Sequence, residues 1–188
     1  MCRFFVAARK PSPHLSLESS HDVSKALLVV DVQNWGFAGD WPVPDHEALL
    51  ERIRDRVEAS RNNGELVVWV QNDGDADEMD APGEYFWELT LPPADGERVW
   101  RKTTKDVFES NPDLAGWLRD QGVTELDLVG LQSEMCVRSS TLGARDAGFT
   151  ARPVPGLHGT YPEGTYDESG PTGVTAAELS ARVDAELA

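Results

Sequence analysis

The sequence has few cysteines and no long apolar run. Its two cysteines, Cys2 and Cys136, form neither a CxxC pair nor a zinc knuckle, so a disulfide scaffold does not organise the chain. The longest strongly apolar stretch, residues 26–30, is too short to span a bilayer. The short apolar block near the first residue lacks the length and cleavage pattern of a signal peptide. We therefore expect a cytoplasmic protein.

Basic residues are also scarce. The 188 residues include 17 Lys and Arg against 33 Asp and Glu, for a net charge of −16. Such a charge repels phosphate backbones and anionic lipid headgroups, which excludes nucleic acid and membrane surfaces as expected partners. The length suits one sizeable core. We expect a flexible N-terminal extension over residues 1–24 and a single domain over residues 25–188.

Short apolar segments alternate with amphipathic ones along the domain. Strands are predicted at 26–30, 66–70, 98–101, 125–129 and 149–154. Helices are predicted around 49–57, 114–118, 136–147 and 175–187, the second of them capped by Ser110 or Asn111 with Pro112 in its first turn. This order predicts an α/β fold, a doubly wound, mainly parallel sheet of five or six strands with helices on both faces.

Three chemically active side chains follow predicted strands. In parallel sheets ligands bind beyond the carboxyl ends of the strands, where Asp31, Lys102 and Cys136 are expected. A thiolate is a nucleophile that a nearby Lys and a helix N-terminus stabilise, and Asp31 can take its proton. Backbone amides around Gln132 and Cys136 can hold an oxyanion. Alone, each residue has an ordinary explanation, as a core thiol, a cap or a surface charge, but together they favour catalysis.

The segments that carry these residues resemble a known family. DVQN after the first strand, KTTKDVF after the third and GLQSEMCV after the fourth are similar to motifs of the isochorismatase-like cysteine hydrolase superfamily, and the likeness covers residues 25–161. The resemblance implies a catalytic triad of Asp31, Lys102 and Cys136. It also implies a cis peptide bond before Gln132 that turns the amides of Gln132 and Cys136 toward an oxyanion.

Within that superfamily, the sequence departs from two branches. Nicotinamidases hold a metal through an Asp-x-His pair and further histidines after the second strand, where this chain has no histidine. We therefore predict no metal and no cofactor. Some members that cleave the vinyl ether of isochorismate lack the cysteine, so its retention here favours C–N hydrolysis through a thioester. The streptothricin-type hydrolases, which open a lactam of a cationic antibiotic, are another branch that the charge permits.

The walls of the expected pocket are predicted from the same loops. Aromatic side chains at strand ends can stack on a flat ligand, and polar ones can hydrogen-bond it. The candidate substrate-binding residues are Trp35, Phe37, Asn72, Trp87, Phe108, Met135 and His158. Each has an alternative role: the aromatic residues can seal the core or a subunit interface, Asn72 can cap a turn, and His158 can be a plain loop histidine.

An acidic run over residues 73–84 follows the second strand. It approaches the spacing of a calcium loop, but Glu78 stands where that loop needs glycine. Beside the pocket, these carboxylates favour a neutral or cationic small-molecule substrate. The C-terminal segment lacks the sixth strand common in the superfamily, which would expose a sheet edge. Together with the resemblance, this predicts a homodimer or larger homo-oligomer.

These expectations combine into one hypothesis with two alternatives. The chain is predicted to be a metal-independent cysteine hydrolase that cleaves a C–N bond of a small amide, lactam or imide. One alternative is an isochorismatase-type vinyl ether hydrolase, which would not depend on the thiol. The other is a non-catalytic binding or scaffold protein that retains the fold.

Overall fold

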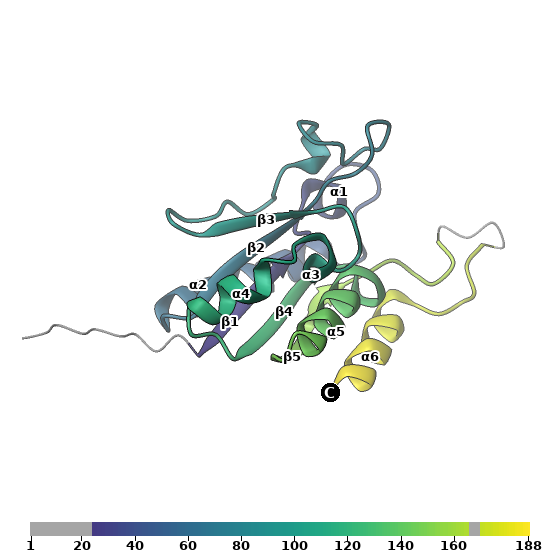
Figure 1. Cartoon of the computed structure of the whole chain (residues 1–188). Helices are drawn as coiled ribbons and strands as arrows, with labels where there is room; N and C mark the ends of the chain where they lie inside the picture. Colours follow the sequence, from purple (N-terminus) through teal and green to yellow (C-terminus); the bar gives the residue numbers. More distant parts are fainter. Residues whose placement is uncertain (1–23, 166–169) are drawn as a thin grey trace, which may run out of the picture.

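The computed structural model describes residues 24–165 and 170–188 and centres on a parallel sheet (Figure 1). The strands lie in the order β3-β2-β1-β4-β5, and every pair is parallel. They are β1 (Lys25–Val30), β2 (Leu66–Asn72), β3 (Arg98–Lys102), β4 (Glu125–Leu131) and β5 (Thr150–Gly159). The predicted α/β class and doubly wound sheet are confirmed, with five strands among the described residues. Most of the predicted N-terminal extension, residues 1–23, lies outside them.

Helices cover both faces of this sheet (Figure 1). One face carries α1 (Asn34–Phe37) and α2 (His46–Asn62), and the other carries α3 (Val107–Ser110), α4 (Leu114–Asp120) and α5 (Arg138–Asp146). The C-terminal α6 (Ala176–Leu187) packs against β5 and α5. A 3₁₀ turn, η1 (Tyr85–Trp87), and a π-helix, η2 (Ser133–Val137), complete the described elements.

The central strand β1 is buried on both sides. Ala26, Leu28 and Val30 contribute to the core under α3, α4 and α5, whereas Leu27 and Val29 contribute to the core under α1 and α2. Alternate side chains of a strand point to opposite faces, so a run of apolar residues fills two layers. This is why the sequence shows an uninterrupted apolar segment there.

Two predicted helix boundaries are wrong. The residue that caps α4 is Asp113, whereas Ser110 ends the separate short helix α3 and Asn111 follows it. The Asn111 side chain instead donates hydrogen bonds to the carbonyls of Arg101 and Val107, so it closes α3 onto β3. Likewise, the predicted helix at 136–147 begins earlier, as the π-helix η2 that continues into α5.

The described helices are short. None of those in residues 24–165 and 170–188 is both long and apolar enough to cross a membrane.

Candidate active site

Asp31, Lys102 and Cys136 meet at the carboxyl edge of the sheet. Asp31 directly follows β1, Lys102 ends β3 and Cys136 lies in η2 after β4. The Lys102 Nζ is 2.9 Å from Asp31 Oδ2 and donates a hydrogen bond of 3.3 Å to Cys136 Sγ. The Asp31 and Lys102 side chains are buried, with 2% and 0% of their surface exposed. An ammonium therefore bridges a buried carboxylate and a thiol.

The backbone around these residues is unusual in three places. Asp31 has a φ of 50°, in the left-handed region that Asp tolerates better than most residues. The neighbouring strand carries Gly130, where a Cβ would lie 1.9 Å from the Val30 carbonyl oxygen, so only glycine lets β4 approach β1 there. The peptide bond between Leu131 and Gln132 is cis.

Burial and charge set the ionisation of the three groups. Burial, together with the Asp31 carboxylate, raises the pKa of the Cys136 thiol to about 12, although Lys102 acts to lower it. Burial also raises the pKa of Asp31, and Lys102 only partly offsets that effect. The pKa of Lys102 is raised, because attraction to Asp31 and Cys136 outweighs its burial. Burial therefore disfavours the charged forms of both the Cys136 thiol and the Asp31 carboxyl, and Lys102 opposes that effect at each.

A cavity of about 660 Å³ opens beside these groups. Asp31 and Cys136 line it, and so do four residues that the sequence predicted for the site, Trp35, Asn72, Gln132 and Met135. Asn72 also accepts a 2.9 Å hydrogen bond from Lys102 Nζ through its Oδ1. The structure thus brings most of the predicted polar groups to one cavity of a size suited to a small molecule.

Four predicted substrate-binding residues lie outside the cavity lining. Phe37 belongs to the core, and Phe108 packs on Phe149 with ring centroids 6.2 Å apart. Trp87 donates from its indole to Asp73 and stacks under Arg101. His158 is buried, with its Nδ1 2.8 Å from Ser133 Oγ and its Nε2 2.8 Å from Asp184 Oδ1. It borders a different and smaller cavity next to α6.

The cavity also has lining residues outside the predicted substrate-binding set, of which Glu78 and Asp80 belong to the acidic run expected beside the pocket. The additional lining residues are Glu78, Met79, Asp80, Thr103, Thr104 and Lys105. The first three come from the connection between β2 and β3, whose path has no periodic signal in the sequence. Gln33, from the DVQN motif, is buried and binds the backbone of Asn72 through both ends of its amide, at 2.8 and 3.0 Å. These two hydrogen bonds hold the backbone of Asn72 in place.

The described residues offer no metal site at this cavity. In residues 24–165 and 170–188, no three His, Cys, Asp or Glu side chains are grouped so that they could hold an ion. Asn72 and Asp73 stand after β2 where a metal-binding member would need histidines. The residues present do not fit a nicotinamidase-type metal centre.

Comparison with known proteins identifies the family and the fold of this chain. A family model described as an isochorismatase domain matches residues 25–169. Two streptothricin hydrolases of Streptomyces noursei are 44% and 41% identical over 139 residues, which is 73% of this chain but only 55% and 50% of theirs. The chain thus spans about half the length of these relatives. An isochorismatase structure from Pseudomonas putida has a TM-score of 0.78 and 21% identity, covering 88% of this chain and 84% of that one, and shows the same fold.

Proposed function

Because this chain belongs to the isochorismatase family, we propose that it is a cysteine hydrolase that cleaves a C–N bond in a small amide, lactam or imide. The observation that carries the proposal is the contact of Lys102 Nζ with both Asp31 and Cys136 at the floor of one cavity. The similarity to two streptothricin hydrolases supports a C–N bond over an ether as the bond cleaved. The proposed steps use these side chains, backbone amides and water, and none of them needs a metal ion.

The first half of the reaction forms a thioester. Asp31 accepts the proton of the Cys136 thiol, and Lys102 stabilises the thiolate as its sulfur attacks the carbonyl carbon. The backbone N–H groups of Gln132 and Cys136 are proposed to hold the resulting oxyanion. As the C–N bond breaks, Asp31 returns the proton to the leaving nitrogen, so the amine departs neutral and the acyl group stays on sulfur.

The second half consumes water. Asp31, again a carboxylate, takes a proton from a water molecule that attacks the thioester carbonyl. The carbon–sulfur bond then breaks, the acid leaves, and the proton returns to Cys136. One water is consumed, and the three side chains end in the protonation states in which they began.

The test compares Cys136→Ala with Cys2→Ala on a set of small amides, lactams and imides that includes streptothricin. We expect Cys136→Ala to lose at least about 1000-fold in kcat/KM, because the nucleophile is gone, and Cys2→Ala to retain activity. A trapped acyl group on Cys136, detected by mass spectrometry after rapid quenching, would identify the intermediate. Undiminished turnover by Cys136→Ala contradicts the mechanism, and thiol-independent product from isochorismate would instead support the ether hydrolase.

A further inference from the structure

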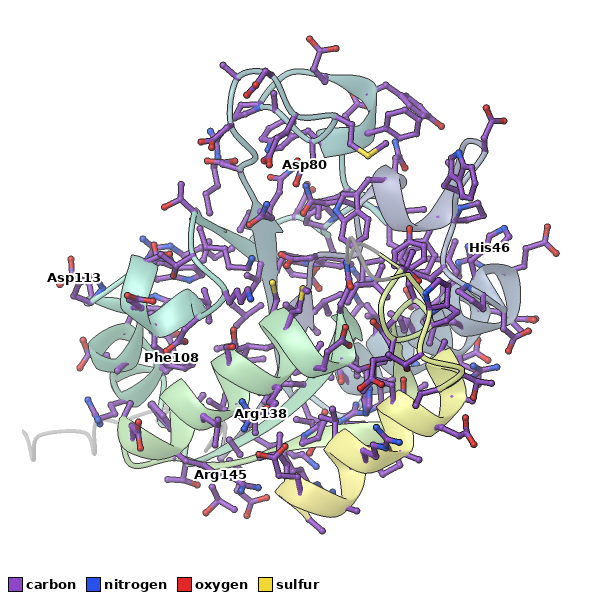
Figure 2. The ribbon with its side chains drawn as sticks, turned by 90° about the vertical axis from the view of Figure 1, so that its right-hand side faces the viewer. His46, Asp80, Phe108, Asp113, Arg138 and Arg145 are labelled. Carbon is purple, nitrogen blue, oxygen red and sulfur yellow. The ribbon has the colours of Figure 1, made fainter. Side chains whose placement is uncertain are left out.

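One wall of the active-site cavity is acidic. Glu78 and Asp80 line it from the connection between β2 and β3, which Figure 2 shows above the carboxyl end of the sheet, with Asp80 labelled on it. Phe108, labelled in the same view, lies well away from Asp80 among the helices of one face. Among the described lining residues, Lys105 is the positively charged one, and it is exposed. Charge on the wall is therefore predominantly negative.

Asp80 is held in place by Asn72, which also contacts Lys102. Its Oδ2 accepts a 2.9 Å hydrogen bond from Asn72 Nδ2, and Asn72 Oδ1 accepts one of 2.9 Å from Lys102 Nζ. A single amide therefore separates the Asp80 carboxylate from the ammonium that contacts Cys136. The carboxylate also lies so close to Gly74 that a Cβ there would be 2.1 Å from Asp80 Oδ1. Asp80 is thus a fixed, half-buried carboxylate and not a freely solvated one.

Two further polar groups of the cavity have no partner. Asp31 Oδ1 and the indole Nε1 of Trp35 are buried, and neither forms a hydrogen bond among the described residues. Asp31 Oδ1 can accept a hydrogen bond and Trp35 Nε1 can donate one, so a polar ligand in the cavity can satisfy both atoms. This independent observation points to a polar ligand in the space that Asp80 faces.

We propose that Asp80, assisted by Glu78, selects substrates that carry an ammonium or guanidinium group close to the bond that is cleaved. The inference rests on the proposed function for the choice of reaction, but the charge preference concerns access to the thiol alone. A cation gains from a carboxylate at short range in a partly buried site, whereas an anion of the same size is repelled. Hydrogen bonds link Asp80 to Cys136 through only two side chains, Asn72 and Lys102. A cation bound at Asp80 therefore lies close to the carbonyl that Cys136 attacks.

The test uses thiol reagents that differ in charge, so it needs no known substrate. Aminoethyl, hydroxyethyl and sulfonatoethyl methanethiosulfonate each transfer their group to a thiolate, forming a disulfide and releasing methanesulfinate. Rates at Cys136 are measured by peptide mass spectrometry and divided by the rates with the uncharged thiol 2-mercaptoethanol, which corrects for the intrinsic reactivity of each reagent. We expect the aminoethyl reagent to exceed the hydroxyethyl reagent by about tenfold, and the sulfonatoethyl reagent to be slowest.

Asp80→Asn tests the residue, since an amide at this position can still accept the hydrogen bond from Asn72. It is expected to abolish most of the tenfold preference. Asp77→Asn removes the same charge from the same connection, but outside the cavity lining, and is the matched control that should keep it. Should Asp80→Asn not fold, as judged by its thermal unfolding, raising the salt concentration on the unmodified protein must weaken the preference instead.

The outcomes separate this inference from the proposed function. Equal normalised rates for the three reagents, or an unchanged preference in Asp80→Asn, would overturn the selection of cations even if amides are hydrolysed. A preference lost in Asp80→Asn and kept in Asp77→Asn supports it, even if the hydrolase proposal fails for lack of turnover.

Discussion

Two buried aspartates sit on the same sheet and differ in almost every respect. Asp31 follows the carboxyl end of β1, whereas Asp127 lies near the amino end of β4, paired in register with Leu27. Asp31 has one cation, Lys102, and faces a cavity. Asp127 is contacted by three cations at distances of 2.7 to 3.1 Å: Lys25, Arg56 and Arg152.

The balance between burial and charged partners decides the direction in which each pKa moves. Burial acts to raise the pKa of both carboxyl groups. At Asp127 the hydrogen bonds from Lys25, Arg152 and Arg56 outweigh burial, so the pKa is lowered. At Asp31 the single ammonium does not outweigh it, so the pKa is raised. The same fold thus lowers the pKa of one buried carboxyl and raises that of the other, and a raised pKa is compatible with the proton transfer proposed for Asp31.

The difference between the two aspartates is tested most strongly by replacing the lysine that contacts each carboxylate. In Lys102→Met, the thiol loses the charge that lowers its pKa, and the buried Asp31 loses its partner. We expect iodoacetamide to alkylate Cys136 at least about 100-fold more slowly, because the thiolate is the reactive form. Peptide mass spectrometry over time measures this rate.

Lys25→Met is the matched control. It makes the same substitution at Asp127, where two arginines remain. The rate of Cys136 alkylation should stay within about twofold of that of the unmodified protein, since the change is remote from the thiol. Equal slowing in both variants would show that the loss reflects general destabilisation and not the contact of Lys102 with Cys136.

A smaller effect is expected on stability when Asp127 is replaced. Asp127→Asn removes the carboxylate that Lys25, Arg56 and Arg152 share and should lower the free energy of unfolding by about 2 kcal/mol at neutral pH. Because the folded pKa of Asp127 lies below its ordinary value of 3.8, its contribution is complete above that value and is lost as pH falls through the folded pKa. Urea unfolding at several pH values should therefore show the two proteins converging in acid.

In the same experiment, ionisation of Asp31 has the opposite effect on the free energy of unfolding. Its folded pKa is raised, so ionisation costs stability at neutral pH, and the cost is relieved as pH falls through the folded pKa. The same raised pKa requires the acid limb of kcat/KM to lie above pH 3.8.

For Asp127, a stability difference between Asp127→Asn and the unmodified protein that stays constant down to pH 3 would contradict the assignment of a lowered pKa to Asp127.

The site shows where sequence reasoning succeeds. Asp31, Lys102 and Cys136 follow three strands, and the rule that parallel strands share a carboxyl edge predicts their convergence without coordinates. The fold is predictable for the same reason, since apolar runs such as 26–30 and 66–70 are long enough to fill both core layers. The contact of Lys102 with Asp31 is thus a consequence of strand order.

The same reasoning fails where side-chain direction depends on irregular backbone. Phe108 follows Lys102 by only six positions, but it lies on α3, which turns it onto Phe149 in the core. Asp80 carries no pattern that separates it from its acidic neighbours, and its position depends on the path of a connection without regular strands. Sequence spacing predicts which loops meet at the site, but not which of their residues face the cavity.

The weakest predicted effect concerns the outermost cation of the Asp127 cluster. The Arg152 side chain is 64% exposed, whereas the Arg56 side chain is 17% exposed and also contacts Glu65 at 2.8 Å. An exposed ion pair is screened by water and salt, so Arg152→Gln should lower the free energy of unfolding by no more than about 0.5 kcal/mol. Arg56→Gln is the comparison and should cost more than Arg152→Gln in urea unfolding at neutral pH. If the two variants lose equal stability, then the number of cations, and not their burial, sets the strength with which the fold holds Asp127 ionised.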